Sequence, residues 1–509
     1  MKNILLIFFF LICLSGRSQT GAVRLEFEAA LNSDIYELVP LGSQGFLVFF
    51  ETRDVAGEGS KNWLFIFYNP SFTEVWKANI PVITDASYQN YIQNDSLLYL
   101  FFLNSDKVKP GTDNFQLLTL DLAKGLSYET KGNLPAESIF VKFCIAGTKV
   151  FLGLNLKNEQ AAIYSIDLKS GPISEFRITY PDQNIIEDIV YDPFHDQVIT
   201  TVSNFIERRQ NKIFMLVLSV DSGFIYDMEV SPVLAGKYLN TAKINIPDSA
   251  QLFLLGTYGS IASKMPSIDE YFGIESAGIY ATRIYEKKQA FMNYYNFMEF
   301  HNLKSGVSAR DYYRLQKKKE RETPEYSMNY ELLTHDPELH DSTLVLMLEA
   351  FYPEFRTVSD ISYDYWGRPI THTYTVFEGY RFFNSILAGF SYNGELVWDN
   401  SLEINVSTIN RLDKKVAYFF DGEPAILFYN DGSKISYRIC LKNAELEPFT
   451  KLNLETSEFG DKITSTGQNW LIHWYDYYFL AYGYHTIRNN LLADKNERTV
   501  FYINKISLE

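Results

Sequence analysis

Residue patterns that mark common enzyme and cofactor sites are missing from the 509-residue sequence. There is no GxSxG nucleophile motif, no HExxH or CxxC metal motif, no EF-hand pattern and no glycine-rich loop for phosphates. Beyond the N-terminus there is also no run of roughly 18 apolar residues that would span a bilayer. These absences argue against the common hydrolase, metal and nucleotide-binding classes, and we expect neither a cofactor nor a metal ion.

Cysteine is scarce, with three residues in the whole chain. Cys13 lies in the N-terminal segment, whereas Cys144 and Cys440 lie in the apolar, strand-like runs VKFCIAG and SYRICLK. We therefore predict two buried free thiols rather than a disulfide or a redox pair. Stability must then come from apolar burial, for which a chain with 46% hydrophobic residues is well supplied.

The first 18 residues, MKNILLIFFFLICLSGRS, have the layout of a signal peptide. Lys2 precedes an apolar run of 11 residues, ILLIFFFLICL, and Gly16 and Ser18 supply the small residues that a signal peptidase requires. We predict cleavage after Ser18, with an uncleaved anchor as the alternative. The mature protein would be periplasmic or associated with the cell envelope, or else secreted, and would have no transmembrane segment.

Basic residues are outnumbered, 46 to 62, which gives a net charge of −16. Loss of Lys2 and Arg17 with the signal peptide would change this value to −18. An acidic surface repels phosphate backbones, so we expect no nucleic-acid partner. A protein of the envelope or a glycan is the expected partner.

Short runs of alternating apolar and polar residues, bounded by Gly, Asn, Asp and Pro, predict an all-β chain. One unit recurs, in which a polar turn joins an apolar strand to a second strand. The units span 63–78, 117–130, 162–176, 214–230, 279–295, 386–400 and 435–449. Their spacing is typical of one four-stranded propeller blade per unit. Because no Pro-rich or Gly-rich linker interrupts residues 19–509, we predict a single β-propeller domain.

The two ends of the mature chain complete this pattern. Residues 499–508 resemble a third blade strand that has no fourth, and residues 22–29 resemble a strand without a blade. Their pairing would close the ring and remove two exposed strand edges. The predicted fold is therefore an eight-bladed β-propeller, with seven blades as the alternative.

The turns near residues 287 and 393 are separated by about two blade lengths, and we expect two insertions, 304–324 and 351–383, to fill this gap, with a ninth blade as the alternative. In the first, Ser308 and Asp311 resemble a capping box and Pro324 a stop, which predicts a short helix over 308–322. This helix would either dock an acidic partner or simply remain solvated. Its basic residues are Arg310, Arg314, Lys317, Lys318, Lys319 and Arg321.

The second insertion is rich in aromatic residues and arginine. Tyr, Trp and Arg dominate binding hot spots, and such rings also stack on sugars. If the rings point outward, the insertion is a binding surface; if they point inward, it is a local core. The candidate binding residues are Tyr363, Tyr365, Trp366, Arg368, Tyr380 and Arg381.

Other polar clusters give weaker evidence for a functional site. The motifs HDPELHD (335–341) and DPFHD (192–196) are interpreted as turns, because their spacing does not make metal ligands converge. Carboxylates flank the aromatic insertion, and a glycosidase requires only two of them. These carboxylates are Glu349, Glu354, Asp360, Asp364 and Glu378.

One turn, FSYNGELVWDN (390–400), resembles the turn-plus-tryptophan element of quinoprotein propellers, with Gly394 four residues before Trp398. The segment FTEVW keeps Trp76 but has Phe72 in place of the glycine, so a quinone cofactor is not supported. The chain resembles uncharacterised secreted β-propeller-like proteins of the Bacteroidota in three features. These are its Tyr/Phe/Asn-rich strands, the RSQT sequence at the end of the signal peptide and the NGELVWDN turn. That resemblance implies no active site.

The sequence thus predicts an exported, non-catalytic binding or scaffold propeller of the cell envelope that recognises a protein partner through surface loops. The alternatives are a glycan-binding module and a hydrolase or lyase that acts on polysaccharide.

Overall fold

The structure is a computed structural model, and it describes residues 23–29, 35–57, 59–106, 111–157, 160–169, 171–206, 210–234, 236–259, 274–301, 303, 317, 328–363, 365–408, 412–420, 422, 425–441, 449–491 and 497–507. Within these ranges, helical structure is limited to two short 3-10 turns, η1 (Gly42–Gln44) and η3 (Phe297–Glu299), and the single residues Leu303 and Lys317. No helix in this part of the chain is long and apolar enough to cross a membrane. The predicted signal peptide, and the helix predicted over 308–322 apart from Lys317, lie outside the described residues.

The described residues form eight antiparallel sheets, numbered here in ring order. Sheet 1 contains β2 (Tyr36–Pro40), β3 (Phe46–Gly57), β4 (Ser60–Tyr68) and β5 (Glu74–Ile83). Sheet 2 contains β6 (Ser87–Asn94), β7 (Leu97–Leu103), β8 (Phe115–Asp121) and β9 (Leu126–Gly132). Sheet 3 contains β10 (Ile139–Ala146), β11 (Lys149–Leu156), β12 (Gln160–Asp167) and β13 (Ile173–Ile178). Sheet 4 contains β14 (Gln183–Asp192), β15 (Gln197–Ile206), β16 (Gln210–Ser219) and β17 (Gly223–Val230).

The later sheets are less regular. Sheet 5 contains β18 (Tyr238–Leu239), β19 (Lys243–Asp248), β20 (Gln251–Gly259), β22 (Gly278–Tyr285) and β23 (Lys288–Asn296). Sheet 6 contains β21 (Glu275–Ser276), β24 (Tyr330–Thr334), β25 (Glu338–His340), β26 (Thr343–Tyr363), β27 (Pro369–Phe390) and β28 (Leu396–Thr408). Sheet 7 contains β29 (Val416–Phe420), β30 (Ala425–Asn430), β31 (Lys434–Cys440) and β32 (Thr450–Asn453). Sheet 8 contains β33 (Lys462–Tyr475), β34 (Tyr478–Arg488), β35 (Glu497–Ser507) and β1 (Arg24–Glu28).

The seven units seen in the sequence coincide with the last two strands of sheets 1 to 7. Unit 63–78 covers parts of β4 and β5, for example, and unit 386–400 covers parts of β27 and β28. The match is incomplete only in unit 435–449, where the second strand, β32, begins one residue later at Thr450. Apolar runs followed by alternating segments therefore located these strand pairs correctly: inner strands such as β8 are buried on both faces, whereas outer strands such as β5 alternate between buried and exposed residues.

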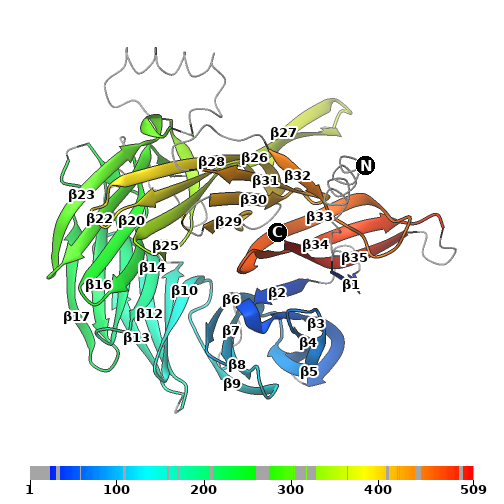
Figure 1. The fold of residues 1–509 in the computed structure, drawn as a ribbon, viewed down its shortest axis with the longest axis horizontal. Coiled ribbons are helices and arrows are strands. Elements are labelled where there is room, and N and C mark those ends of the chain that lie inside the picture. Colours follow the sequence, from blue (N-terminus) through cyan, green and yellow to red (C-terminus); the bar gives the residue numbers. More distant parts are fainter. Residues whose placement is uncertain are drawn as a thin grey trace, which may run out of the picture.

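Apolar side chains fill the space between each sheet and the next. A cluster that includes Phe49 and Phe102 lies between sheets 1 and 2, and equivalent clusters join the later sheets in turn. A further cluster, with Phe46, Leu480 and Phe501, joins sheet 8 to sheet 1. The colours in Figure 1 accordingly pass around the molecule from blue to red and return beside the blue strands. Antiparallel sheets of four to six strands packed in such a succession form a β-propeller, so the predicted all-β propeller class is confirmed.

The N-terminal strand β1 is the outer strand of sheet 8. Its five residues pair with β35 in antiparallel register, from Arg24 opposite Asn504 to Glu28 opposite Val500. The first strand of the described chain therefore belongs to the same sheet as the last three, and Figure 1 shows β1 beside β35.

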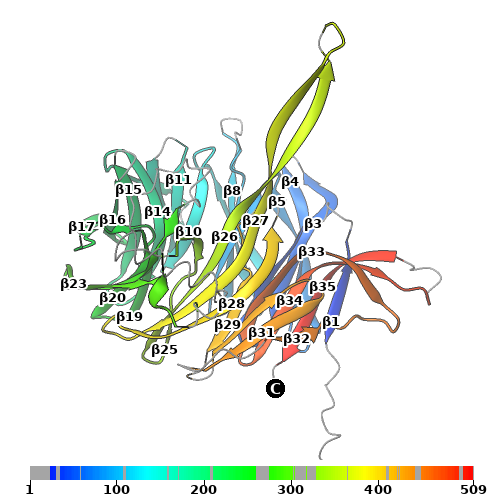
Figure 2. The same cartoon turned by 90° about the horizontal axis from the view of Figure 1, so that it is seen from above.

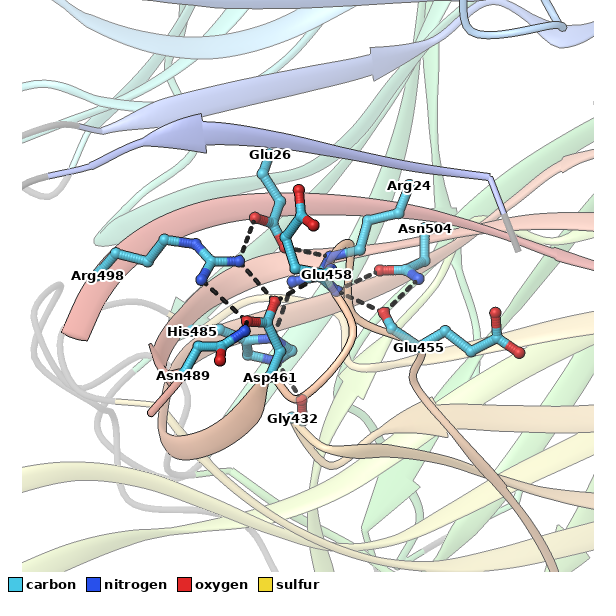
Figure 3. Close-up of polar contacts among 10 residues, drawn as sticks. All are labelled: Arg24, Glu26, Gly432, Glu455, Glu458, Asp461, His485, Asn489, Arg498 and Asn504. Atoms are coloured by element: carbon cyan, nitrogen blue, oxygen red, sulfur yellow. Dashed lines mark hydrogen bonds and ion pairs between the residues drawn. The ribbon is translucent and has the colours of Figure 1, made fainter. Parts of the chain in front are cut away.

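A buried polar cluster ties β1 to the rest of sheet 8 (Figure 3). We call it the closure cluster, and it comprises Arg24, Glu26, Asp461, His485, Asn489, Arg498 and Asn504. The Glu26 carboxylate accepts from Arg24 Nε at 2.7 Å and from Arg498 Nη2 at 3.2 Å. Arg498 also donates to both carboxylate oxygens of Asp461, at 3.1 and 2.6 Å. Charges removed from water are stable only when paired in this manner.

Both cysteines of the described chain are buried and free, as predicted. Cys144 lies in β10 and Cys440 at the end of β31, each inside an apolar cluster. Burial raises the pKa of the Cys144 thiol to about 12, so this group stays protonated and unreactive at neutral pH.

The turn that resembles a quinoprotein element has a structural role. Gly394 adopts a φ of 71°, which an L side chain disfavours, and Ser391 N–H donates to the carbonyl of Glu395 across the turn at 2.9 Å. Trp398 is buried between sheets 6 and 7, and its ring lies against Gly389. A Cβ atom at residue 389 would lie 2.3 Å from that ring, so glycine is required there.

Candidate binding surface

The aromatic insertion is a two-stranded arm that projects beyond the sheets, as Figure 2 shows. Strand β26 pairs with β24 only as far as Phe351, and β27 pairs with β28 only from Tyr380 onward. Residues 352–379, called the arm from here on, lie between these limits, and within it β26 and β27 pair with each other. The predicted insertion is therefore an extension of β26 and β27, two neighbouring strands of sheet 6.

The local sequence explains why the arm consists of strands. Its core register runs from Phe355 opposite Phe377 to Tyr363 opposite Pro369. The positions between them are dominated by Thr, Val, Ile and Tyr, which favour extended backbone. Gly379, with a φ of 134°, lies next to a β-bulge between Glu354 and Phe355, where the arm leaves the body.

Four of the six predicted binding residues lie at the far end of the arm. Tyr363, Tyr365 and Trp366 have exposed fractions of 71%, 95% and 77%, and Arg368 is also exposed. Tyr365 and Trp366 contact each other at a ring distance of 5.8 Å and an angle of 88°. Gly367, with a φ of 74°, forms the turn beside them. Of the two possibilities left open by the sequence, the outward orientation is the one found for this group, which we call the tip.

The other two predicted residues, Tyr380 and Arg381, lie at the base of the arm and are half-buried. The ring of Tyr380 packs against Phe351 and Phe377, with centroid distances of 5.6 and 5.1 Å. Arg381 donates to Asn405 Oδ1 at 2.9 Å and to Glu354 Oε1 at 3.4 Å. These two side chains anchor the arm to sheet 6, so the six residues do not form one continuous surface.

The two faces of the arm differ in charge. One face presents the cross-strand pairs Phe355/Phe377, Thr357/Thr375, Ser359/Thr373 and Ile361/Thr371, all without charge. The opposite face presents Arg356/Val376, Val358/Tyr374, Asp360/His372 and Ser362/Ile370. Arg356 forms an exposed ion pair with Glu378 at 2.9 Å. The arm is thus apolar or neutral on one side and carries both signs of charge on the other.

Three of the five carboxylates predicted near the arm have partners in the structure, and a fourth, Asp364, lies outside the described residues. Glu349 is fully buried and accepts from His335 Nε2 at 2.7 Å and from the backbone N–H of Lys415 and Val416. Glu354 and Glu378 pair with Arg381 and Arg356. Such pairing leaves little scope for the acid and base roles that a glycosidase assigns to two carboxylates.

The prediction that 335–341 consists of turn residues is wrong for Glu338–His340, which form β25. Before this strand, between β24 and β25, lies His335. Its ring is buried, and burial lowers its pKa despite the neighbouring Glu349. The next residue, Asp336, meets Lys142 at 3.1 Å and Lys243 at 3.9 Å. Burial would raise the pKa of Asp336, but the lysines outweigh it and hold that pKa well below its usual range. The sequence missed this network because its members come from sheets 3, 5 and 6.

The second histidine motif is a turn, as predicted. Asp196 has a φ of 53° in the loop between β14 and β15, and His195 Nδ1 lies 2.7 Å from Asp192 Oδ2. Among the described residues, no group of His, Cys, Asp and Glu could hold a metal ion.

A cavity of about 280 Å³ lies between the outer strands of sheets 3 and 4. It contains Glu175 and Asp221, but Glu175 pairs with Arg177 at 2.6 Å and Asp221 with Lys149 at 2.9 Å. The pKa of Glu175 is lowered, chiefly by Arg177, so this carboxyl is ionised and cannot act as an acid at neutral pH.

Comparison with known proteins gives little information. No protein-family model matches the sequence, and no curated protein sequence matches it. Among solved structures, the chain is similar to the polysaccharide lyase Uly1, at 9% identity and a TM-score of 0.39, over 94% of this chain and 100% of that one. It is also similar to the WD40 domain of SCAP from fission yeast, at 9% identity and a TM-score of 0.42, over 96% and 98%.

A third similar structure is the β-propeller domain of the Trilobed protease from Pyrococcus furiosus, at 9% identity and a TM-score of 0.33, over 82% of this chain and 96% of that one. At such low identities and TM-scores, none of these likenesses bears on what this chain binds.

Proposed function

We propose that the chain is an eight-bladed β-propeller, closed by the pairing of β1 with β35, that acts as a non-catalytic binding or scaffold protein of the cell envelope. It recognises a protein partner through the arm. The signal-peptide layout of residues 1–18 supports export, and the ring order of the eight sheets supports the blade number.

The exposure of the tip carries this proposal. Tyr365 and Trp366 are large aromatic side chains exposed to water at the end of the two-stranded arm (Figure 2), and exposed aromatic groups that lie together mark interaction surfaces. Rigid aromatic anchors of this kind dominate protein interfaces because they bury much area with little loss of entropy.

A protein partner fits the tip better than a glycan does. Sugar rings stack on a flat aromatic platform, whereas the rings of Tyr365 and Trp366 stand at 88° to each other. Two perpendicular rings are instead suited to enter separate pockets of a protein surface. Catalysis on polysaccharide is disfavoured by the pairing of Glu349, Glu354 and Glu378 described above.

The double substitution Tyr365→Ser/Trp366→Ser tests the proposal. We expect it to reduce capture of a protein partner from envelope extract at least about tenfold, since losing two anchor side chains commonly removes more than about 2 kcal/mol of binding energy. The melting temperature should stay within about 2 °C of wild type, because both side chains are exposed.

The matched control is Phe459→Ser, which removes another aromatic ring, 93% exposed, on the loop between β32 and β33. Capture by this variant should equal that by wild type. If the tip variant and the control capture the same partner equally well, the tip is not the interface.

A further inference from the structure

No strand of the described residues pairs with the outer edge of β26 along the arm. Beyond Phe351, β26 pairs on one side with β27, and no other strand of the described chain pairs with it on the other side. Proteins normally protect such edges by proline, bulges or a covering segment, because open backbone N–H and C=O groups recruit another strand. A two-stranded ribbon is also only marginally stable in water, so a third strand would stabilise it.

The charges along this edge are self-complementary. Arg356 and Asp360 lie two residues to either side of Val358 and point to the same face of the strand. If a second copy pairs antiparallel with this edge about a two-fold axis at Val358, Arg356 of each copy lies opposite Asp360 of the other. The same register places Phe355 opposite Ile361 and Thr357 opposite Ser359, so that apolar and hydroxyl side chains also match.

The neighbouring two-fold registers bring no opposite charges together. An axis at Thr357 would place Glu354 of one copy opposite Asp360 of the other, and an axis at Ser359 would place Arg356 opposite the uncharged Ser362. Like charges directly opposite each other destabilise a strand pair. Among these three registers, only the axis at Val358 creates two attractive pairs and no repulsive one.

The edge of β27 lacks this complementarity. Residues 369–377 carry no charged side chain apart from the titratable His372, so no ion pair would fix a register there. Pairing of β26 with β27 of another copy would repeat without closing and give a filament, whereas the two-fold pairing of β26 closes on itself.

Because the arm is long, the two acidic propellers can lie far apart in this dimer. Val358 lies seven residues beyond Phe351, which is about 23 Å of extended strand. Antiparallel pairing sends the two bodies to opposite ends, about 45 Å apart, whereas the Debye length is about 8 Å at physiological salt. The net charge of −16 on each chain therefore opposes this dimer very little.

We propose that two copies of the chain dimerise through the β26 edges of their arms, which form a four-stranded antiparallel sheet about a two-fold axis at Val358. This inference rests on the proposed function, namely that the arm binds protein, and it names a second copy as the partner.

Sedimentation velocity on the purified protein tests it with charge variants. Wild type should form dimers over a concentration series of about 1–100 μM. Arg356→Asp and Asp360→Arg should each weaken the dimer at least about tenfold, because each creates two repulsive pairs. A mixture of the two single variants should form heterodimers, since every opposed pair in that complex is attractive again.

Glu378→Gln is the matched control, because it removes the ion-pair partner of Arg356 within the chain but no pair between chains. Its dimer should be as strong as that of wild type. A monomeric wild type over the whole series, or a mixture that stays monomeric while wild type is dimeric, overturns the proposal. If wild type is monomeric but loses an envelope partner on Tyr365→Ser/Trp366→Ser, the proposed function survives and only the dimer is refuted.

Discussion

Arg498→Met should lower the free energy of unfolding by about 3 kcal/mol. Arg498 bridges two carboxylates of the closure cluster, Glu26 on β1 and Asp461 just before β33, and the Asp461 side chain is fully buried (Figure 3). Removing one partner of a buried ion pair typically costs about 3–5 kcal/mol, because the remaining charge is left without compensation. We expect a loss at the lower end of this range, because Glu26 keeps its ion pair with Arg24.

Urea denaturation of wild type and variant at pH 7.5 measures this difference. Arg488→Met is the matched control: its guanidinium is exposed and donates only to Asn490 among the contacts seen, so its effect should stay within about 0.5 kcal/mol. The double variant Arg498→Met/Asp461→Leu should recover much of the loss, since replacing a whole buried pair by apolar side chains is often neutral. A loss below about 1 kcal/mol in Arg498→Met would show that the cluster does not stabilise the closure.

Acidification from pH 7.5 to 4.5 should destabilise the protein by about 2–3 kcal/mol through His485 alone. The ring of His485 is fully buried and stacks on Tyr502 at 3.8 Å. Its Nδ1 faces Arg24 Nη2 at 3.3 Å, and because a guanidinium can only donate, Nδ1 must accept and the ring must be neutral. The Nε2–H then donates to the carbonyl of Gly432.

Burial, reinforced by Arg24, lowers the pKa of His485 to about 4, from about 6.5 in the unfolded chain. Between these two values the unfolded state binds a proton that the folded state does not, so stability falls as the pH falls through this window. Below about pH 4, further loss of stability comes from the carboxylates. Burial raises the pKa values of Glu26 and Asp461, but Arg24 and Arg498 outweigh it and lower them. Their stabilisation is present above about pH 4 and is lost as the pH drops further.

Unfolding free energies of wild type and His485→Gln, measured from pH 7.5 to 4.5, separate His485 from other groups. Glutamine can accept from Arg24 and donate to Gly432 without taking up a proton, so its slope with pH should be smaller by about 2–3 kcal/mol over the range. The pKa of His335 is also lowered, but His335 is present in both proteins, so its contribution to the pH dependence is the same in each. Equal slopes in the two proteins would contradict the assignment.

Local sequence was sufficient for the strand pairs but not for the polar clusters. Alternation in segments such as WLFIFYNPSFTEVWKA specifies which residues face a neighbouring sheet, and it located the last two strands of sheets 1 to 7. The closure cluster joins residues near position 25 to others near 460, 485 and 500. Nothing local predicts their contact, although Arg24 and Glu26 in RLEFE alternate with Leu25 and Phe27, which is the pattern of a strand with a second, polar face.

The arm was located but misread for a similar reason. Aromatic content drew attention to residues 351–383, yet the segments RTVSDIS and ITHTYTV alternate like strands, and this pattern was the sign of a long hairpin. Tyr380 and Arg381 were grouped with the tip by composition, whereas their position beside β28 places them at the base. Composition identifies a surface only when the register of its strands is also known.

The pairing of Arg24 with Asn504 also governs the timing of folding. Some 470 residues separate β1 from β35. At a synthesis rate of about 5–20 residues per second, β35 is therefore synthesised roughly 25 to 95 seconds after β1. During this interval β1 must avoid pairing with other strands, and the contact order of the final step is among the highest that the chain can have. A newly made chain is therefore most vulnerable to aggregation and proteolysis just before its last strand is complete, when seven sheets can form and the eighth cannot.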